Sequence, residues 1–398
     1  MKQAVLLSLL LYAGWSTGVR AFIAPIHHLQ RQKRFVTPQY ASRRDFLVTS
    51  ALAATAPDGT GATTNQTPQP LVTLPMIRLQ LPKNGFGREY IAMPLYINGK
   101  GPYEFMLDTG LTAEFITPHL EKEVFRARPD SSPRSFSVQG IAAAGTSTQR
   151  LVDLPGVSLC CKRDGESLNV PELHAIVTDF PQEHIDPKHD PIEGMLGMEF
   201  LSMYDVDLDF PNNQIRLYEQ GTLSCPKNMV EIPATVINET GLLAIRVKKP
   251  GLNQPVVALI DCGSAFSVVN WAATPFLGMS SDKKDYQNLP AIQGIGVDGK
   301  TMQLPISPQQ TLTFVGEPRM DQGRIVGFQE PPNDWRNWKP ISLAVGDLPA
   351  FSNVLGDGVT PYRGPAILIG LDILSQRRVI FKGSETRRRQ IFITKDQA

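Results

Sequence analysis

Three short sequence landmarks occur twice along the chain, in the same order. An apolar strand-like segment ends in Asp-x-Gly at Phe105–Gly110 and again at Ala258–Gly263. A Gln-Gly-Ile segment follows at residues 139–141 and 293–295, and an apolar pair followed by glycine ends each series. The near-equal spacing predicts that the chain folds as two diverged copies of one unit, each about the size of a domain.

Strand-like segments fill most of both copies, separated by clusters of Gly, Pro and Asn. Tyr90–Ile97 and Leu242–Val247 alternate or run apolar and are expected to be strands. A short helix is expected at Pro118–Phe125, and another after each apolar-apolar-Gly landmark, where Glu199 and Asp372 suit the positive end of the helix dipole. We therefore expect a mostly β protein.

The landmarks and the breaks between them predict the domain organisation. The first copy is expected at residues 86–220 and the second at residues 230–395, with a linker at residues 221–229. Residues 315–365, with several Pro and Gly, are interpreted as an insertion in the second copy. Residues 57–85 are expected to form a flexible linker or mature N-terminus, because their beginning is rich in Thr, Pro, Gly and Gln.

Residues 1–56 are interpreted as a targeting leader. An apolar segment typical of a secretory signal comes first, and a basic stretch without acidic residues follows as far as Asp45. The pair Arg43-Arg44 precedes a mild apolar run that ends in Ala54-Thr55-Ala56, as in a twin-arginine export signal. This series of signal, transit and twin-arginine elements resembles the leader of a plastid protein from an alga with complex plastids. It implies the thylakoid lumen; the alternatives are the plastid stroma and the secretory pathway.

Charge and cysteine content exclude several classes of function. The formal net charge is +1, but residues 1–56 hold seven basic residues and one acidic residue, so the remainder is net negative. No nucleic acid partner is therefore expected. The four cysteines lack a metal-type spacing, so no zinc or other metal site is expected, and one disulfide can form among Cys160, Cys161 and Cys225. The leader's apolar run is too short to argue for a membrane span, and none is expected in the mature chain.

The paired Asp-x-Gly sequences indicate the chemistry. An ionised carboxylate at the end of an apolar strand is costly to bury alone. If the loops that carry Asp108 and Asp261 face each other, their carboxylates share one proton and one water, because like charges this close do not both ionise easily. One carboxylate then acts as general base on the water, while its protonated partner donates to the carbonyl oxygen of the substrate. Gly110 and Gly263 permit the close approach of the two loops.

On these residues, the chain resembles the retropepsin-like and pepsin-like aspartic proteases over about residues 86–395. The resemblance implies a mostly β, two-lobed and pseudo-symmetric fold with closed β-barrel lobes. Each lobe contributes an Asp-Thr/Ser-Gly loop, a glycine-bearing flap and a supporting apolar-apolar-Gly element; two flaps are closer to a fused retropepsin dimer than to pepsin. The matching residues are the dyad Asp108 and Asp261, the dyad-loop residues Thr109, Gly110, Cys262, Gly263 and Ser264, the flap residues Gln139, Gly140, Ile141, Gln293, Gly294 and Ile295, and the supports Gly197 and Gly370.

The resemblance implies an aspartic endopeptidase that acts as a monomer on an extended polypeptide, with no cofactor and no covalent intermediate. Two positions depart from the family pattern: Leu111 stands where Ser or Ala is usual, and Cys262 where Thr or Ser is usual. The Thr109 hydroxyl can bond across to the opposing loop, whereas the Cys262 thiol is only a weak donor. The alternative is therefore a catalytically degenerate protein that binds peptides or proteins without cutting them.

Other polar and aromatic clusters are interpreted as structural. The acidic alternation at residues 205–209 predicts a solvent-facing side of a strand. The segment at residues 184–190, with its histidines, indicates an exposed loop, and the basic run at residues 387–389 a solvated turn. The tryptophans at 335 and 338 are expected to pack the insertion against its own lobe.

Overall fold

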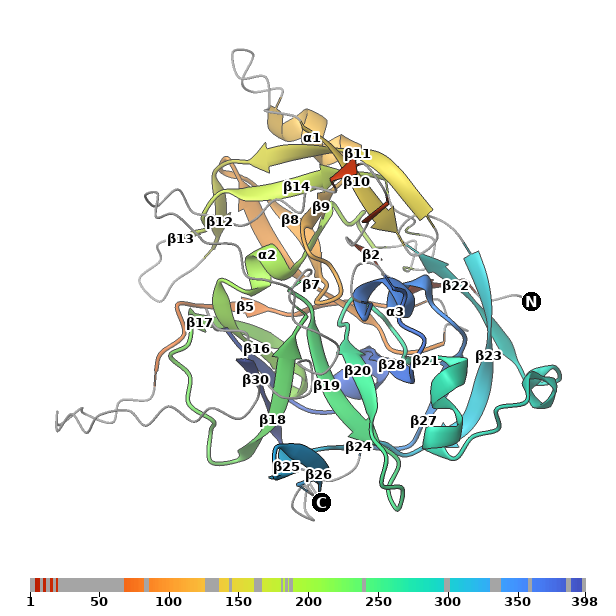
Figure 1. Ribbon diagram of the computed structural model, residues 1–398. Helices are drawn as coiled ribbons and strands as arrows, with labels where there is room; N and C mark the ends of the chain where they lie inside the picture. The colour runs from red at the N-terminus through yellow and green to blue at the C-terminus, as the bar shows by residue number, and fades with distance from the viewer. Residues whose placement is uncertain are drawn as a thin grey trace, which may run out of the picture.

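The computed structural model describes residues 68–395 apart from the gaps 82–85, 126–135, 143–144, 161–166, 180–181, 183–184, 186–188, 238–240, 297–300, 330–337, 357–359 and 384–387. It also describes the backbone of the leader strands β1 (Ala4–Leu7), β2 (Leu10–Leu11), β3 (Trp15–Ser16) and β4 (Val19–Arg20). The rest of the predicted leader lies outside the described residues. Strands dominate and helices are short (Figure 1), so the mostly β class is confirmed. None of the helices among the described residues combines the length and the apolar character of a membrane span.

The first copy and the leader strand β2 form an 11-stranded sheet in the order β13-β12-β7-β8-β15-β9-β14-β11-β10-β2, with β6 paired to β7. The ten strands other than β2 are β6 (Ile77–Leu79), β7 (Tyr90–Ile97), β8 (Lys100–Leu107), β9 (Glu114–Ile116), β10 (Phe136–Ala142), β11 (Gly145–Leu154), β12 (Val157–Leu159), β13 (Leu168–Asn169), β14 (Leu173–Val177) and β15 (Gly194–Leu196). Strands β8 and β15 run parallel, which sets Leu107 beside Leu196. The expected helix after β9 is α1 (Pro118–Phe125), and the one after β15 is α2 (Met198–Leu201).

The second copy repeats this strand order. Strands β19-β20-β28-β21-β27-β23-β22 neighbour one another as β7-β8-β15-β9-β14-β11-β10 do. The parallel pair β20 and β28 sets Ile260 beside Ile369, as β8 and β15 do with their last residues. The strands are β19 (Leu243–Lys248), β20 (Val256–Ile260), β21 (Val268–Val269), β22 (Ala291–Gly296), β23 (Thr301–Gln310), β24 (Thr313–Phe314), β27 (Ile341–Val345) and β28 (Ala366–Ile369), with helices α3 (Pro349–Val354) and α4 (Leu371–Leu374).

Strands from both copies and from the segment before them join in the order β18-β30-β29-β16-β17-β5, here called the connecting sheet. Its members are β5 (Val72–Pro75), β16 (Tyr204–Asp209), β17 (Gln214–Glu219), β18 (Met229–Val236), β29 (Val379–Lys382) and β30 (Arg388–Thr394). In Figure 1 the orange strand β5 lies beside β17. Val72 and Leu74 are buried in this sheet, so the chain is already part of the fold within the stretch expected to be a linker, residues 57–85.

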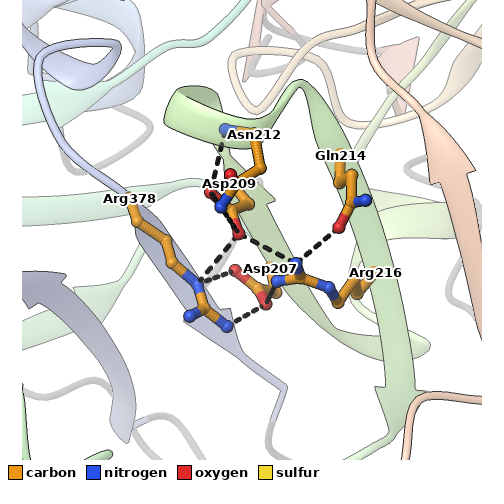
Figure 2. A network of polar contacts seen from close by, with 6 residues as sticks. All are labelled: Asp207, Asp209, Asn212, Gln214, Arg216 and Arg378. Carbon is orange, nitrogen blue, oxygen red and sulfur yellow. Dashed lines mark hydrogen bonds and ion pairs between the residues drawn. The ribbon is translucent and has the colours of Figure 1, made fainter.

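The acidic alternation on β16 is buried, and the solvent-facing strand face expected there is wrong. Strand β16 lies inside the connecting sheet, between β17 and β29. Arg216 Nη1 lies 3.0 Å from Asp207 Oδ2, and Arg378 Nε lies 2.8 Å from Asp207 Oδ1 (Figure 2). Burial alone would raise the pKa of Asp209, but hydrogen bonds from Asn212 and Arg216 lower it overall. Because Arg378 comes from the second copy, this network ties the two copies together.

The structure also decides several smaller predictions, some of which are wrong. Strand β27 lies within the segment expected to be an insertion, but it pairs with β21 and β23 in the second copy's sheet. Arg388 and Arg389 belong to β30 instead of a solvated turn. Trp338 is buried against Phe314, in agreement with the packing role expected for it. Cys160 is disulfide-bonded while Cys225 is free, which excludes a pair between these two.

Candidate active site

The two Asp-x-Gly loops begin in the same way. Asp108 follows β8, and its N–H donates to the carbonyl of Leu196 at 2.9 Å. Asp261 follows β20, and its N–H donates to the carbonyl of Ile369 at 3.0 Å. Each loop then turns back on its own carboxylate: Gly110 N–H donates to Asp108 Oδ1 at 2.7 Å.

In the second loop, Gly263 N–H donates to Asp261 Oδ1 at 2.9 Å. The two Oδ1 atoms are therefore both fixed by a backbone N–H two residues later. Hydrogen bonds to the ionised form of a carboxylate favour that form, so each loop partly offsets the cost of burying its charge. The parallel strand pairs position both turns, since each Asp continues a strand that pairs with the strand leading to Gly197 or Gly370.

Thr109 and Cys262 interlock the loops through reciprocal hydrogen bonds. The Thr109 hydroxyl donates to the carbonyl of Ile260 at 3.0 Å and accepts from the N–H of Cys262 at 3.0 Å. On the other side, the Cys262 thiol donates to the carbonyl of Leu107 at 3.4 Å and accepts from the N–H of Thr109 at 3.3 Å. The thiol thus occupies the same bonding position as the hydroxyl, at the longer distances that sulfur requires.

The carboxylates come together because the loops approach very closely. A Cβ placed on Gly110 would lie 2.8 Å from Asp261 Cγ, which leaves room only for glycine. Asp108 is 0% and Asp261 1% exposed. Burial raises the pKa of Asp261 well above its usual range, and the negative charge of Asp108 raises it further. The geometry therefore favours one protonated and one ionised carboxyl group over two charges.

Gly197 and Gly370, the glycines of the third landmark, pack directly against the backbone of the two aspartate loops. A Cβ on Gly197 would lie 2.5 Å from the carbonyl oxygen of Ala113, and one on Gly370 would lie 2.5 Å from that of Phe266. The helix that follows each glycine also bonds to the loop: Met198 N–H donates to the carbonyl of Leu111 at 2.8 Å.

In the second copy, Leu371 N–H donates in the same way to the carbonyl of Ser264 at 2.8 Å. The position that departs from the family pattern, Leu111, thus keeps the backbone contact of its counterpart Ser264. Their side chains differ, since Leu111 is buried among apolar residues, whereas the Ser264 hydroxyl donates to the carbonyl of Phe266 at 2.7 Å.

The predicted flap residues lie in two hairpins. Gln139, Gly140 and Ile141 are on β10, which pairs with β11. Gln293, Gly294 and Ile295 are on β22, which pairs with β23. Each hairpin also pairs with a leader strand. Strand β10 pairs with β2 in antiparallel orientation, and β22 pairs with β1 in parallel orientation.

Two polar clusters behind the loops were missed by sequence reasoning, which assigned Glu199 and Asp372 only to the helix dipole. Asp372 accepts hydrogen bonds from both the backbone and the hydroxyl of Ser267. Glu199 binds His174 and faces the buried Glu114. The available signal was an acidic residue inside the apolar segment Glu114–Ile116, six residues after the first aspartate. Among the described residues, no group of three or more His, Cys, Asp or Glu could hold a metal ion.

Comparisons with known proteins bear mainly on the first copy. Residues 93–200 match the family model described as Aspartyl protease, which spans the first Asp-x-Gly loop, the β10–β11 hairpin and Gly197. No curated protein sequence matches the chain. Among solved structures, the chain is similar to basic 7S globulin from soybean, with 11% identity, a TM-score of 0.39, and coverage of 81% of this chain and 94% of that one. It is also similar to conglutin gamma, a basic 7S globulin from lupine seeds, with 13% identity, a TM-score of 0.39, and coverage of 82% and 95%.

Proposed function

We propose that this protein is an aspartic endopeptidase in which Asp108 and Asp261 activate a water for the hydrolysis of a peptide bond. The observation that carries the proposal is the interlocked pair of buried loops, in which Gly110 lies against the carboxylate of Asp261. The Aspartyl protease match over residues 93–200 supports the first half of this site. The recurring strand order supports a two-lobed, pseudo-symmetric, retropepsin-like fold with closed barrel lobes.

The chemistry follows from the proton that the pair retains. The ionised carboxylate removes a proton from the water as it attacks the carbonyl carbon, and the protonated carboxyl donates to the carbonyl oxygen. The carboxyl that took the proton of the water then donates it to the peptide nitrogen, the C–N bond breaks, and the intermediate returns a hydroxyl proton to the other carboxylate as the product carboxyl group forms. The interlock of Thr109 and Cys262 holds the two loops in register through this sequence, as catalysis requires reacting groups to keep their geometry.

The substrate class is an extended polypeptide. A strand that lies between β10 and β22 would gain main-chain hydrogen bonds from both hairpins, with side-chain pockets providing selectivity. The leader strands β1 and β2 support this mode, since they pair with β22 and β10. Because one chain supplies both aspartate loops, a monomer is sufficient, and the leader supports a location in the plastid, most simply the thylakoid lumen.

The alternative is a peptide- or protein-binding module without catalysis. It is favoured by the departures at Leu111 and Cys262, the latter of which makes longer bonds than a hydroxyl would. In that case the same hairpins would hold a polypeptide, and the buried pair of aspartates would serve only to stabilise the interlocked loops.

Paired peptide libraries separate these functions. One library carries a hydroxyl-bearing tetrahedral carbon in place of the scissile carbonyl, and its matched control carries a methylene at the same position. An endopeptidase should bind the best hydroxyl peptides at least about 100-fold more tightly than their methylene counterparts, because the transition state is bound more tightly than the ground state. Asp108→Asn and Asp261→Asn should each abolish that preference. Equal binding of both libraries by the parent chain would favour the binding module.

A further inference from the structure

The two copies brace their aspartate loops with different chemistry. In the second copy, Ser267 lies six residues after Asp261 and its hydroxyl has two roles. It accepts a hydrogen bond from the N–H of Gly370 at 3.0 Å and donates to Asp372 Oδ1 at 2.6 Å. The Ser267 N–H donates to Asp372 Oδ2 at 2.9 Å, so the buried carboxylate has two donors. This brace needs no proton beyond that of the hydroxyl.

Glu114 stands at the equivalent place in the first copy, six residues after Asp108, and Glu199 stands where Asp372 does. Glu114 is 0% exposed, and its Oε1 accepts from the N–H of Phe200 at 2.9 Å. Its buried Oε2 receives no hydrogen bond from a described donor, and the carboxyl of Glu199 faces it closely enough for the two groups to share a hydrogen bond if one of them carries a proton. The first copy thus sets a carboxyl group against a carboxyl group.

One shared proton would remove the repulsion between the carboxyl groups of Glu114 and Glu199. If Glu114 is protonated, it can accept from Phe200 and donate to Glu199, which are the two roles that the Ser267 hydroxyl fills in the second copy. If both groups are ionised, two negative charges lie side by side in a buried position. Burial raises the pKa of Glu114 well above its usual range, and the charge of Glu199 raises it further, so the protonated form persists to higher pH than in an exposed glutamate.

His174 connects this pair with solvent. Its Nδ1 lies 2.7 Å from Glu199 Oε1, its Nε2 lies 3.6 Å from Asp153 Oδ1, and the side chain is half-exposed. The hydrogen bond to Glu199 raises the pKa of His174, and the charges of Glu199, Asp153 and Glu172 add to this effect. Among the described residues, Glu199 on α2 is the charged group that acts on Glu114, while Asp153 on β11 and Glu172 just before β14 act on His174. The neighbouring strand β15 carries only Gly, Met and Leu.

The brace acts directly on the catalytic loop. Helix α2, which carries Glu199, is bonded to that loop through the N–H of Met198 and the carbonyl of Leu111 at 2.8 Å. The strand before it receives the N–H of Asp108 at the carbonyl of Leu196. A repulsion that moves α2 away from β9 therefore also moves the backbone on both sides of the first aspartate.

We infer that Glu114 is a positioning residue that holds one proton with Glu199, and that loss of this proton at raised pH releases the first aspartate loop and sets the upper pH limit of the site. The inference rests on the proposed function for its effect on cleavage, but its effect on folding is independent of catalysis. Glu114 has no role in contacting the substrate or the attacking water and acts only through α2.

The sign of the pH effect follows from the direction of the shifts. Glu114 and His174 both bind protons more tightly in the folded chain than in the unfolded chain. The stability that they contribute is therefore present at low pH and is lost as the pH rises through their native pKa values. In the pH range between the pKa of Glu114 in the unfolded chain and its pKa in the folded chain, this proton should add a factor of about ten per pH unit to the rise of the unfolding equilibrium constant.

The test uses Glu114→Gln, because glutamine can accept from Phe200 and donate to Glu199 without titrating. Urea unfolding and peptide cleavage are measured between about pH 4 and pH 9. The matched control is Glu193→Gln, which removes another carboxylate that is paired with a histidine, His119, in the same copy. At acidic pH, E114Q should be as stable and as active as the parent. At higher pH, its unfolding equilibrium constant should lack the additional tenfold rise per pH unit, and it should keep cleaving to a pH at least about one unit above the limit of the parent. E193Q should unfold and cleave over the same pH range as the parent.

Two outcomes would overturn the inference. In the first, the free energy of unfolding of E114Q falls with rising pH as steeply as that of the parent. In the second, E114Q loses as much stability at acidic pH as Glu114→Ala does. If no chain cleaves peptides, the proposed function fails, yet the unfolding curves of E114Q and the parent still decide whether this proton exists. If the unfolding curves differ as expected but the cleavage limits coincide, the proton stabilises the fold without positioning the site.

Discussion

The interlock between Thr109 and Cys262 gives the sharpest prediction about the architecture of the site. In Cys262→Ala, the N–H of Thr109 loses its acceptor at 3.3 Å and the carbonyl of Leu107 loses its donor at 3.4 Å. Both groups are buried, and a buried N–H left without a partner costs about 1–3 kcal/mol. We expect Cys262→Ala to lose about this much free energy of unfolding.

Cys262→Thr should behave in the opposite way. The equivalent position already holds Thr109, whose hydroxyl makes the same reciprocal bonds at 3.0 Å, so a β-branched hydroxyl residue suits this geometry. Each hydroxyl bond contributes about 0.5–1.5 kcal/mol. We expect Cys262→Thr to be as stable as the parent or more stable, and to keep or raise kcat/KM.

Urea unfolding and kcat/KM on one cleavable peptide measure both effects. Cys225→Ala is the matched control, because Cys225 is a free and exposed cysteine. Cys262→Ala should also lose about tenfold or more in kcat/KM, since 1.4 kcal/mol corresponds to a factor of ten. A Cys262→Ala chain as stable and as active as Cys225→Ala would show that the thiol does not hold the two loops together. An inactive parent rescued by Cys262→Thr with Leu111→Ser would instead support the binding-module alternative for the natural chain.

Three further predictions concern packing and processing. Gly110→Ala should abolish cleavage, because its Cβ would lie 2.8 Å from Asp261 Cγ; a folded, fully active variant would show that the loops do not approach as described. Arg378→Met should lower the free energy of unfolding by about 2–3 kcal/mol. This is less than the loss expected from breaking a fully buried ion pair, because Arg378 is 25% exposed and Arg216 still binds Asp207. An unchanged urea midpoint would contradict this. N-terminal sequencing of the natural protein should find a mature chain that begins near Pro57, and retention of Arg43-Arg44 would exclude export to the lumen.

Local patterns predicted the elements that depend on local sequence. Tyr90–Ile97 and Pro118–Phe125 are a strand and a helix with the expected bounds, because alternation and short-range turn signals specify them. The Asp-x-Gly loops were also recognisable, since each follows an apolar strand and recurs with its companion landmarks. Elements and loops that are specified by neighbouring residues were therefore largely accessible from the sequence.

Contacts between distant segments were not accessible. The period-two pattern at Asp207 is the same for a solvent-facing strand and for one inside the connecting sheet. The hydrogen bond from Arg378, which belongs to the other copy, offsets the cost of burying the Asp207 carboxylate, and the local sequence does not reveal it. Glu114 likewise looked like one polar residue in a short strand. Its partner Glu199 and the histidine that reaches solvent, His174, lie on separate elements that the fold brings together.

Cleavage of a denatured-protein mixture at acidic pH tests the central claim most directly. The parent chain from Pro57 onward, Asp108→Asn and Asp261→Asn are compared by mass spectrometry of the peptides released. Each aspartate alone can hold the water but cannot supply both the base and the acid, so the losses should be severe and non-additive. We predict new peptides from the parent and none above background from either variant. Equal cutting by the parent and both variants would show that Asp108 and Asp261 are not the catalytic pair.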